Sequence, residues 1–476
     1  MNLCELTASQ MRLLIQRREL SPVELLDACI ERIETLNPAF NAIVARCVDR
    51  ARQEAKRAQA QLQLQGPQGL GLLHGIPIAI KDLTETAGLR TTFGSPRFRD
   101  HVPAKDESVV AAIRGCGGIV LAKTNTPEFG IGGNTTNRVY GATRNPFNPE
   151  LTSGGSSGGA AVAVATGMVP LATGTDSGGS LRNPAAFCGV VGLRPTPGLI
   201  PSERRAQGWS PMGVHGPMAR NVADAALLLQ AMISHDTCDP LSYPQSRRFD
   251  QLDDVALDEL TLGLSTDLGF APVDAGVVRT FRDKLTLVAP LFKECRDLEL
   301  SQPTAERASW ILRCLYLLAT HADKLASFGD ELEPRLRENL HAARRLSMDD
   351  VAWAVAEQTR VYRAFEQSLR GCSVLVCPAA AVPPFPVDCL YPATINNAPL
   401  DHYAQWMAIT YGITLVGHPA LVIPCGRDDA GLPFGIQLVA RPHQDHLLMR
   451  IGHAIESQLA RDPRSARPTP PTERFS

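Results

Sequence analysis

Two serines in glycine-rich frames and one upstream lysine are the residues of this chain best suited to chemistry. Ser156 lies in a Thr-Ser-Gly-Gly-Ser-Ser-Gly-Gly segment, and Ser180 ends a Gly-Thr-Asp-Ser-Gly-Gly-Ser segment. Lys81 follows the apolar run Gly-Ile-Pro-Ile-Ala-Ile. None of these three segments contains a histidine, so lysine is the best base that they offer for activating a serine.

Ser180 is the candidate nucleophile, because its frame could place backbone N–H groups beside its hydroxyl. A serine hydroxyl is a poor nucleophile at neutral pH and must lose its proton as it attacks. Backbone donors at Ser177, Gly178 and Gly179 could hold the oxyanion of a tetrahedral intermediate, each typically contributing about 3 kcal/mol. The alternative interpretation is a tight turn that merely requires glycine.

Lys81 could act as the base if burial at the end of its strand lowers the pKa of its amine. Alternatively, Lys81 stays charged and pairs with Asp82 or reaches solvent. Ser156 could pass a proton from Ser180 to Lys81 and later protonate the leaving amine. A flexible linker is the other interpretation of the Ser156 segment, although an apolar helix should begin at Gly159.

Helices and strands that could position these groups can be predicted along most of the chain. Two helices should begin at capping boxes, Thr7 to Gln10 and Ser21 to Glu24, and another should run from about Ala42 to Leu62. From Leu73 to about His235, short apolar runs alternate with helical stretches, which is typical of a mixed sheet covered by helices. Other expected strands are 260–265, 421–424 and 434–440, and other expected helices are 273–287, 446–459 and much of 303–370.

Composition and charge exclude several classes of protein. Of the 476 residues, 44% are hydrophobic and 20% are charged, which is typical of a globular chain. A net charge of −2 without a basic block argues against a nucleic-acid ligand. No signal-peptide pattern and no uninterrupted apolar stretch of membrane-spanning length is present, so we expect a cytoplasmic protein without a membrane partner.

Taken together, the serine and lysine segments resemble the amidase signature family. The resemblance extends over about residues 5–460 and rests on eight segments: 75–82, 123–129, 154–159, 174–182, 184–189, 192–196, 417–424 and 431–439. It implies an α/β fold, a single α/β/α sandwich with a large mixed central sheet. Residues 1–65 would form an N-terminal helical segment, 66–462 the main domain with a variable pocket-shaping insert at 303–397, and 463–476 a loose tail.

The resemblance also implies roles for individual residues. Ser180 would be the acyl-forming nucleophile, Ser156 the bridging residue after a cis Gly155–Ser156 peptide bond, and Lys81 the base. The implied oxyanion hole consists of backbone N–H groups, those of Ser177, Gly178, Gly179 and Ser180. The implied supporting residues are Ser157 and Asp176, and the implied substrate contacts are Phe129, Gly132, Gly133 and Asn134. Neither a metal nor an organic cofactor is implied.

The implied activity is hydrolysis of an uncharged aryl or alkyl amide through an acyl-enzyme, with esters and carbamates as side substrates. Candidate pocket-wall residues are Trp310, Tyr316, Tyr391 and Trp406. The family also includes the glutaminase subunit of the glutamyl-tRNA amidotransferase, but its Asp-Gln element is absent from the segment 209–217. A non-catalytic binding relative is the second alternative, which the presence of all three triad residues disfavours. We expect a small-molecule substrate and a monomer or homodimer.

Overall fold

The computed structural model describes residues 2–475 and has one large mixed sheet at its centre. Its eleven strands lie in the order β1-β3-β2-β6-β8-β7-β14-β15-β11-β9-β10. The strands are β1 (Ile43–Arg46), β2 (Pro77–Lys81), β3 (Ile119–Thr124), β6 (Leu171–Asp176), β7 (Val191–Arg194), β8 (Val214–Ala219), β9 (Thr261–Leu264), β10 (Glu294–Asp297), β11 (Val374–Pro378), β14 (Ala420–Arg427) and β15 (Pro433–Val439). Two small hairpins, β4 (Thr136–Asn137) with β5 (Gly141–Ala142) and β12 (Thr394–Ile395) with β13 (Ala398–Pro399), lie apart from it.

Parallel pairing is found near both edges of the sheet, and antiparallel pairing is found at its centre. The β2 strand is parallel to β3 and β6, and β9 is parallel to β10 and β11. From β6 to β11 the neighbouring strands are antiparallel. The predicted mixed sheet between helices is therefore confirmed.

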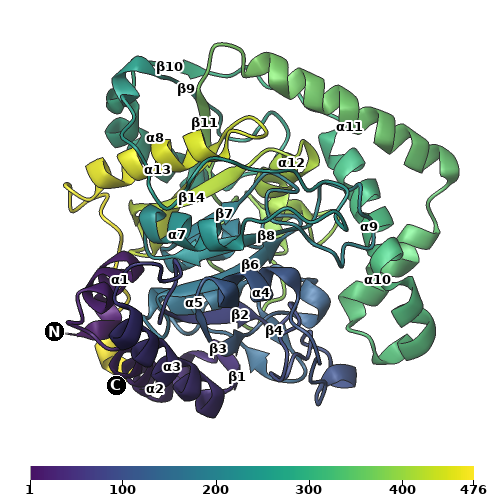
Figure 1. Cartoon of the computed structure of the whole chain (residues 1–476). Coiled ribbons are helices and arrows are strands. Elements are labelled where there is room, and N and C mark those ends of the chain that lie inside the picture. Colours follow the sequence, from purple (N-terminus) through teal and green to yellow (C-terminus); the bar gives the residue numbers. More distant parts are fainter. Residues whose placement is uncertain (1, 476) are drawn as a thin grey trace.

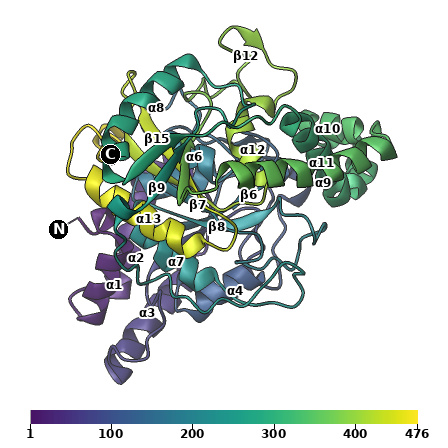
Figure 2. The same ribbon diagram turned by 90° about the horizontal axis from the view of Figure 1, so that it is seen from above.

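Thirteen α-helices in residues 2–475 surround the sheet (Figure 1). They are α1 (Ala8–Gln16), α2 (Pro22–Phe40), α3 (Val48–Gln65), α4 (Ser108–Gly115), α5 (Gly158–Ala165), α6 (Arg182–Cys188), α7 (Val222–Met232), α8 (Ala275–Val288), α9 (Ala305–Phe328), α10 (Pro334–Arg344), α11 (Met348–Ser368), α12 (Ala408–Leu415) and α13 (Asp445–Leu459). The α9, α10 and α11 helices pack together at one side of the molecule (Figure 2). Both predicted capping boxes, at Thr7 and Ser21, are present.

The α5 helix is the element that fixes the first serine segment. All eight of its residues are buried, because its glycines, alanines and valines are small enough for close packing against β6, β8 and α6. A Cβ atom on Gly159 would lie 2.3 Å from the backbone nitrogen of Asn125, so no larger residue fits there. The chain before α5 therefore enters the core at a fixed position.

Two expectations about the ends of the chain are wrong. Residues 43–46 form a strand instead of the start of a helix, because their backbone pairs with β3 at the sheet edge, and the helix begins only at Val48. The expected loose tail is packed against the N-terminal helices. Phe475 contacts Phe40 with ring centroids 4.9 Å apart, and Arg32 donates to Thr472 Oγ1 at 3.0 Å.

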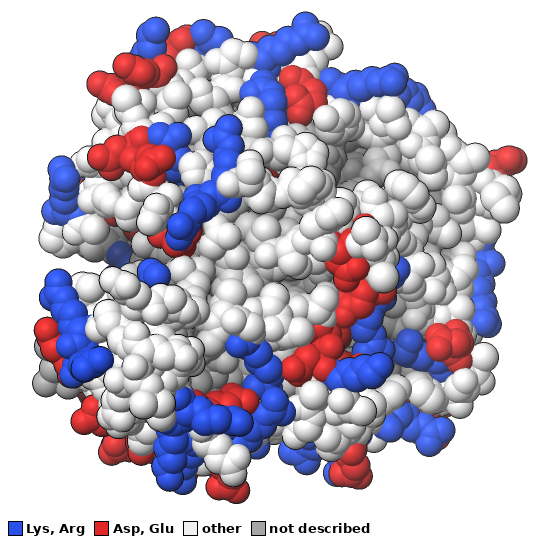
Figure 3. All heavy atoms as spheres, in the orientation of Figure 1, with Lys and Arg blue, Asp and Glu red and all other residues white. Residues whose placement is uncertain are grey.

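The surface carries no extended region of one charge on the face seen in Figure 3, where both signs are interspersed around a hollowed, mostly uncharged centre. This distribution agrees with the net charge of −2. In the described part of the chain, no helix combines the length and the apolar character needed to cross a membrane.

Candidate active site

Lys81 is the last residue of β2, which lies between β3 and β6, and it is completely buried. Its Nζ lies 2.8 Å from Ser156 Oγ, 2.8 Å from Ser157 Oγ and 2.9 Å from Thr175 Oγ1. All three partners are hydroxyl groups, so none of them neutralises an ammonium. Burial lowers the pKa of Lys81 well below its ordinary value, and Asp176 opposes this shift only in part. The site therefore favours a neutral amine.

Ser156 and Ser157 lie in a turn held by hydrogen bonds on both sides. The Gly155–Ser156 peptide bond is cis, as the resemblance implies. Thr135 Oγ1 donates to the carbonyl of Gly154 at 2.8 Å and accepts from the N–H of Gly158 at 3.0 Å. The N–H of Ser157 donates to the carbonyl of Ser180 at 3.1 Å, which joins the two serine segments directly.

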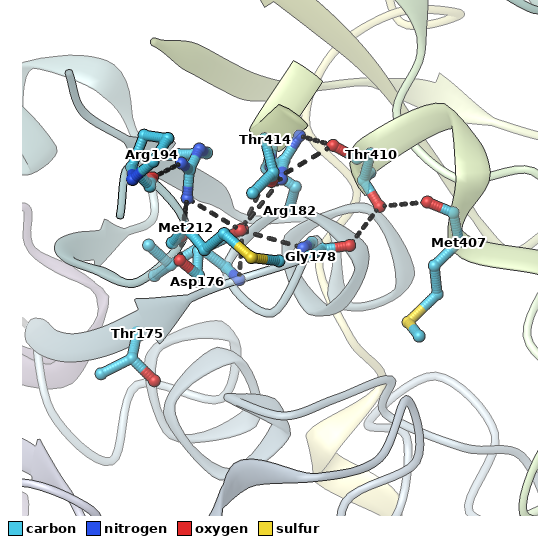
Figure 4. A network of polar contacts seen from close by, with 12 residues as sticks. Thr175, Asp176, Gly178, Arg182, Arg194, Met212, Met407, Thr410 and Thr414 are labelled. Carbon is cyan, nitrogen blue, oxygen red and sulfur yellow. Dashed lines mark hydrogen bonds and ion pairs between the residues drawn. The ribbon is translucent and has the colours of Figure 1, made fainter. Parts of the chain in front are cut away.

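Asp176 lies in a buried polar network with Arg182 and Arg194, next to the turn at Gly178 (Figure 4). Its carboxylate accepts from the N–H groups of Gly179 at 2.9 Å and Leu181 at 3.1 Å. It also forms a fully buried ion pair with Arg182, with a second guanidinium, Arg194, at 3.5 Å. Burial alone would raise the pKa of Asp176, but the two guanidinium groups outweigh it and lower the pKa below its ordinary value.

The expected set of oxyanion donors needs one correction. The N–H of Gly179 already donates to Asp176, so in this structure it is not free to bind an oxyanion. Among residues 2–475, the N–H groups of Ser177, Gly178 and Ser180 have no hydrogen-bond acceptor. These three groups are therefore the available donors, and Asp176 orients the turn that presents them.

Replacing Asp176 with asparagine should destabilise the protein by about 3–5 kcal/mol, because two buried guanidinium groups would lose their counter-charge. Urea unfolding at pH 7 measures this loss. Asp283→Asn, at a largely exposed carboxylate beside Lys284, is the control and should change stability by less than about 1 kcal/mol. Equal effects of the two changes would contradict the role given to Asp176.

The lowered pKa of Asp176 also predicts the sign of a pH effect on stability. A carboxyl with a depressed folded-state pKa stabilises the protein above its unfolded pKa of about 3.9, and this contribution is lost as the pH falls further. Wild type should therefore lose stability below about pH 4 more steeply than Asp176→Asn. Parallel acid-unfolding curves for the two proteins would contradict this prediction.

A cavity of about 520 Å³ opens beside Ser156 and also includes Thr175 and Ser177 in its lining. One wall consists of aromatic side chains, among them Phe93, Phe98, Phe129, Phe328 and Tyr316. The Phe98 ring lies 6.0 Å from Phe129 and 6.2 Å from Phe328, in edge-to-face arrangements. A second, smaller cavity of about 30 Å³ contacts Ser177 and Gly178 together with Trp310, Met407 and Tyr411.

The residues that family position suggested for substrate binding fall in different places. Phe129 lines the large cavity, whereas Gly132, Gly133 and Asn134 do not. Gly133 packs against Trp406, and a Cβ there would lie 2.1 Å from that ring. Asn134 is buried, donates to the carbonyls of Val387 and Cys389, and accepts from Thr152 Oγ1. These three residues therefore support the loop around the site and do not contact the cavity.

Of the four candidate wall residues, two line cavities and two do not. Tyr316 lines the large cavity and Trp310 the small one. Trp406 is fully buried, with its ring stacked 6.3 Å from that of Phe187, and Tyr391 is partly exposed beside Tyr403. Trp406 thus belongs to the core.

Several residues of the site were not found from the sequence. Thr175 contacts Lys81 only because β6 lies beside β2 in the sheet. Phe93 and Phe98 meet Phe328 at the cavity although Phe328 lies far along the chain from both, and no local pattern marks them. In residues 2–475, no group of three or more His, Cys, Asp or Glu side chains is arranged to hold a metal ion.

The Amidase family model matches residues 24–449, and the chain belongs to that family. It is 35% identical over 460 residues to an acylamidase of Rhodococcus erythropolis, with 96% of each chain covered. It is 32% identical over 466 residues to a glutamyl-tRNA(Gln) amidotransferase subunit of Gloeothece citriformis, covering 92% of this chain and 95% of the relative.

Solved structures give the same assignment. A bacterial aryl acylamidase of the amidase signature family superposes with a TM-score of 0.88 at 28% identity, with 96% of each chain covered. The 6-aminohexanoate cyclic dimer hydrolase superposes with a TM-score of 0.82 at 26% identity, covering 96% of this chain and 98% of that chain. The protein is therefore an amidohydrolase with the amidase signature fold.

Proposed function

We propose that this protein hydrolyses uncharged aryl or alkyl amides through an acyl-enzyme on Ser180. The observation that carries the proposal is the buried Lys81 amine, 2.8 Å from Ser156 Oγ and without a carboxylate hydrogen-bonded to it. A neutral amine in this position can accept a proton through Ser156. Among residues 2–475, the Ser180 hydroxyl has no hydrogen-bond partner, so it is free to turn toward Ser156 when substrate binds.

The reaction would proceed in two balanced steps. Ser180 Oγ attacks the amide carbonyl while its proton passes to Ser156 and the proton of Ser156 passes to Lys81. Backbone N–H groups of Ser177, Gly178 and Ser180 stabilise the oxyanion. Ser156 then protonates the nitrogen as the carbon–nitrogen bond breaks, and it regains a proton from Lys81, which returns to the neutral amine. Water then attacks the acyl-enzyme while its proton passes through Ser156 to Lys81, and the same proton returns through Ser156 to Ser180 as the acyl–oxygen bond breaks and the carboxylic acid leaves. Esters and carbamates can enter the same path because only the leaving group differs.

The positions of the two cavities support an assignment for the two halves of the substrate. The leaving nitrogen must lie beside Ser156, which protonates it, and Ser156 lines the large aromatic cavity. We therefore place the amine part in this cavity. The acyl part would face the cavity of about 30 Å³ beside Ser177 and Gly178, which offers much less room than the large cavity of about 520 Å³. Amides of short carboxylic acids with aromatic amines fit both spaces.

The glutaminase subunit of a glutamyl-tRNA amidotransferase is the second candidate function, because subunits of such amidotransferases are 31–33% identical to this chain. Against it stands the aromatic wall around Phe98 and Phe129, whose apolar surface suits an aryl group better than the polar side chain of glutamine. We also propose that the chain acts without partner subunits, as a monomer or homodimer in the cytoplasm.

A substrate panel separates these candidates. The purified chain should hydrolyse short-chain anilides with a kcat/KM at least about 100-fold above that for glutamine, because glutamine cannot fill the aromatic cavity. Release of aniline and of ammonia measures the two reactions. Weak glutamine hydrolysis without any anilide turnover would contradict the proposal and favour the subunit that requires partners.

A further inference from the structure

One end of the large cavity carries two polar side chains that the proposed mechanism does not use. His215 lies on β8, directly across from Thr175 on β6. Thr175 is one of the three residues whose hydroxyl group contacts Lys81 Nζ. Glu107 comes from the start of α4. Both side chains line the cavity, and each residue is only 7% exposed. They therefore face a substrate close to the reacting atoms.

His215 has unused hydrogen-bonding capacity. Its Nδ1 is buried and has no partner among residues 2–475. Its Nε2 lies 3.9 Å from Glu107 Oε2, which is too long for a direct hydrogen bond. Burial and the nearby Arg205 lower the pKa of His215 to about 4, so the ring is neutral near pH 7 and offers one donor and one acceptor. The Nε2 atom, which faces Glu107, also forms no hydrogen bond within residues 2–475 and is available to a ligand.

Glu107 presents a second unused atom. Its Oε1 accepts from the N–H of Glu85 at 2.7 Å and lies 3.9 Å from the guanidinium of Arg204, whereas its Oε2 lies 3.9 Å from His215 Nε2. Burial raises the pKa of Glu107 to about 7. An atom seated between His215 Nε2 and Glu107 Oε2 could hydrogen-bond to both, because two bonds of ordinary length span a gap of 3.9 Å.

The charges around this gap favour a neutral occupant. Three positive charges act on Glu107 or His215 and disfavour an ammonium group in the gap between them: Arg204, Arg205 and Lys123. Glu203 and Asp239 act as negative charges, and Glu107 itself would repel a carboxylate. A hydroxyl is neutral and both donates and accepts, so it can pair with either tautomer of the histidine.

We propose that His215 and Glu107 form a subsite for a hydroxyl group on the amine part of the substrate, and that they set a preference for hydroxylated aryl amides. The inference rests on the proposed function, because the amine part occupies this cavity only if Ser156 protonates the leaving nitrogen. Because His215 lies across from Thr175, the subsite places the substrate hydroxyl close to the amide. The rate of hydrolysis should therefore depend on the position of the hydroxyl on the aryl ring.

Turnover of matched substrates tests the subsite. For wild type, the kcat/KM for at least one of 2-, 3- and 4-hydroxyacetanilide should exceed that for acetanilide about 10-fold or more. His215→Leu and Glu107→Gln should each reduce this ratio at least about fivefold, and His215→Asn should restore part of it. His341→Leu, at an exposed histidine on α10, should leave the ratio as it is. Equal losses for acetanilide and its hydroxylated forms, or no preference in wild type, would overturn the proposal.

A binding measurement separates failure of the subsite from failure of the proposed function. Titration calorimetry of Ser180→Ala with aniline and with the three aminophenols requires no turnover. We expect at least one aminophenol to bind about 10-fold more tightly than aniline, and His215→Leu in the same background to remove the difference. Equal binding of all four amines would overturn the subsite even if anilides are hydrolysed. Tighter aminophenol binding without any amide turnover would support the subsite and contradict the proposed reaction.

Discussion

Replacing Ser180 with alanine should lower kcat/KM for anilide hydrolysis by about 10⁴- to 10⁶-fold, the range typical for loss of a serine nucleophile. The change removes the only atom that the proposed mechanism allows to bond to the acyl carbon. It should leave the fold intact, because among residues 2–475 the Ser180 hydroxyl has no hydrogen-bond partner to lose. Steady-state release of the amine measures the effect, and thermal unfolding confirms that the variant is folded.

Ser177→Ala is the matched comparison for this change. It removes a neighbouring hydroxyl in the same turn but keeps the backbone N–H group assigned to the oxyanion. Its loss of activity should be at least about 100-fold smaller than that of Ser180→Ala. If both variants lose similar activity, the turn as a whole matters and Ser180 is not singled out as the nucleophile.

Replacing Lys81 with methionine should lower kcat/KM by about 10²- to 10⁴-fold, the range for loss of a general base. Methionine is of similar length and apolar, so it suits a fully buried position. The fall in kcat/KM caused by Lys81→Met should not add to the fall caused by Ser180→Ala, because the two residues act in one proton relay. A double variant that is about as slow as Ser180→Ala alone would show this.

The pH profile separates a base from a residue that merely fills space. Burial holds the pKa of Lys81 well below its ordinary value, and only the neutral amine can accept a proton. Wild-type kcat/KM should therefore fall as the pH drops through this pKa, whereas Lys81→Met should lack that acidic limb. An acidic limb of the same position and steepness in both proteins would contradict the role of Lys81.

The sequence predicted which serine and lysine segments meet better than it predicted the cavity beside them. Lys81, Ser156 and Ser180 each lie in a short motif whose glycines and apolar neighbours restrict the backbone locally, and the structure brings the three segments together. The cavity wall depends on contacts such as Phe98 with Phe328, which join segments distant in the chain. Periodicity within one element carries no information about such contacts.

The predictions that proved wrong also depend on contacts that the sequence pattern does not show. Ile43–Arg46 is a strand because β3 lies beside it, although its own sequence continues readily into the helix that follows. Trp406 was a candidate wall residue, but Gly133 and Phe187 enclose it in the core. Gly179 was expected to donate to an oxyanion, but Asp176, three residues earlier, accepts its N–H. Each outcome was decided by a neighbour in space that the local pattern does not specify.

The central claim is that the acyl group of the substrate becomes covalently attached to Ser180. The most direct test is to mix the protein with an activated short-chain ester, quench with acid within milliseconds to seconds, and map the modified peptide by mass spectrometry. We predict one added acyl group, located on Ser180, in wild type and none in Ser180→Ala. An acyl group found on another residue, or a burst of product without any covalent adduct, would contradict the account.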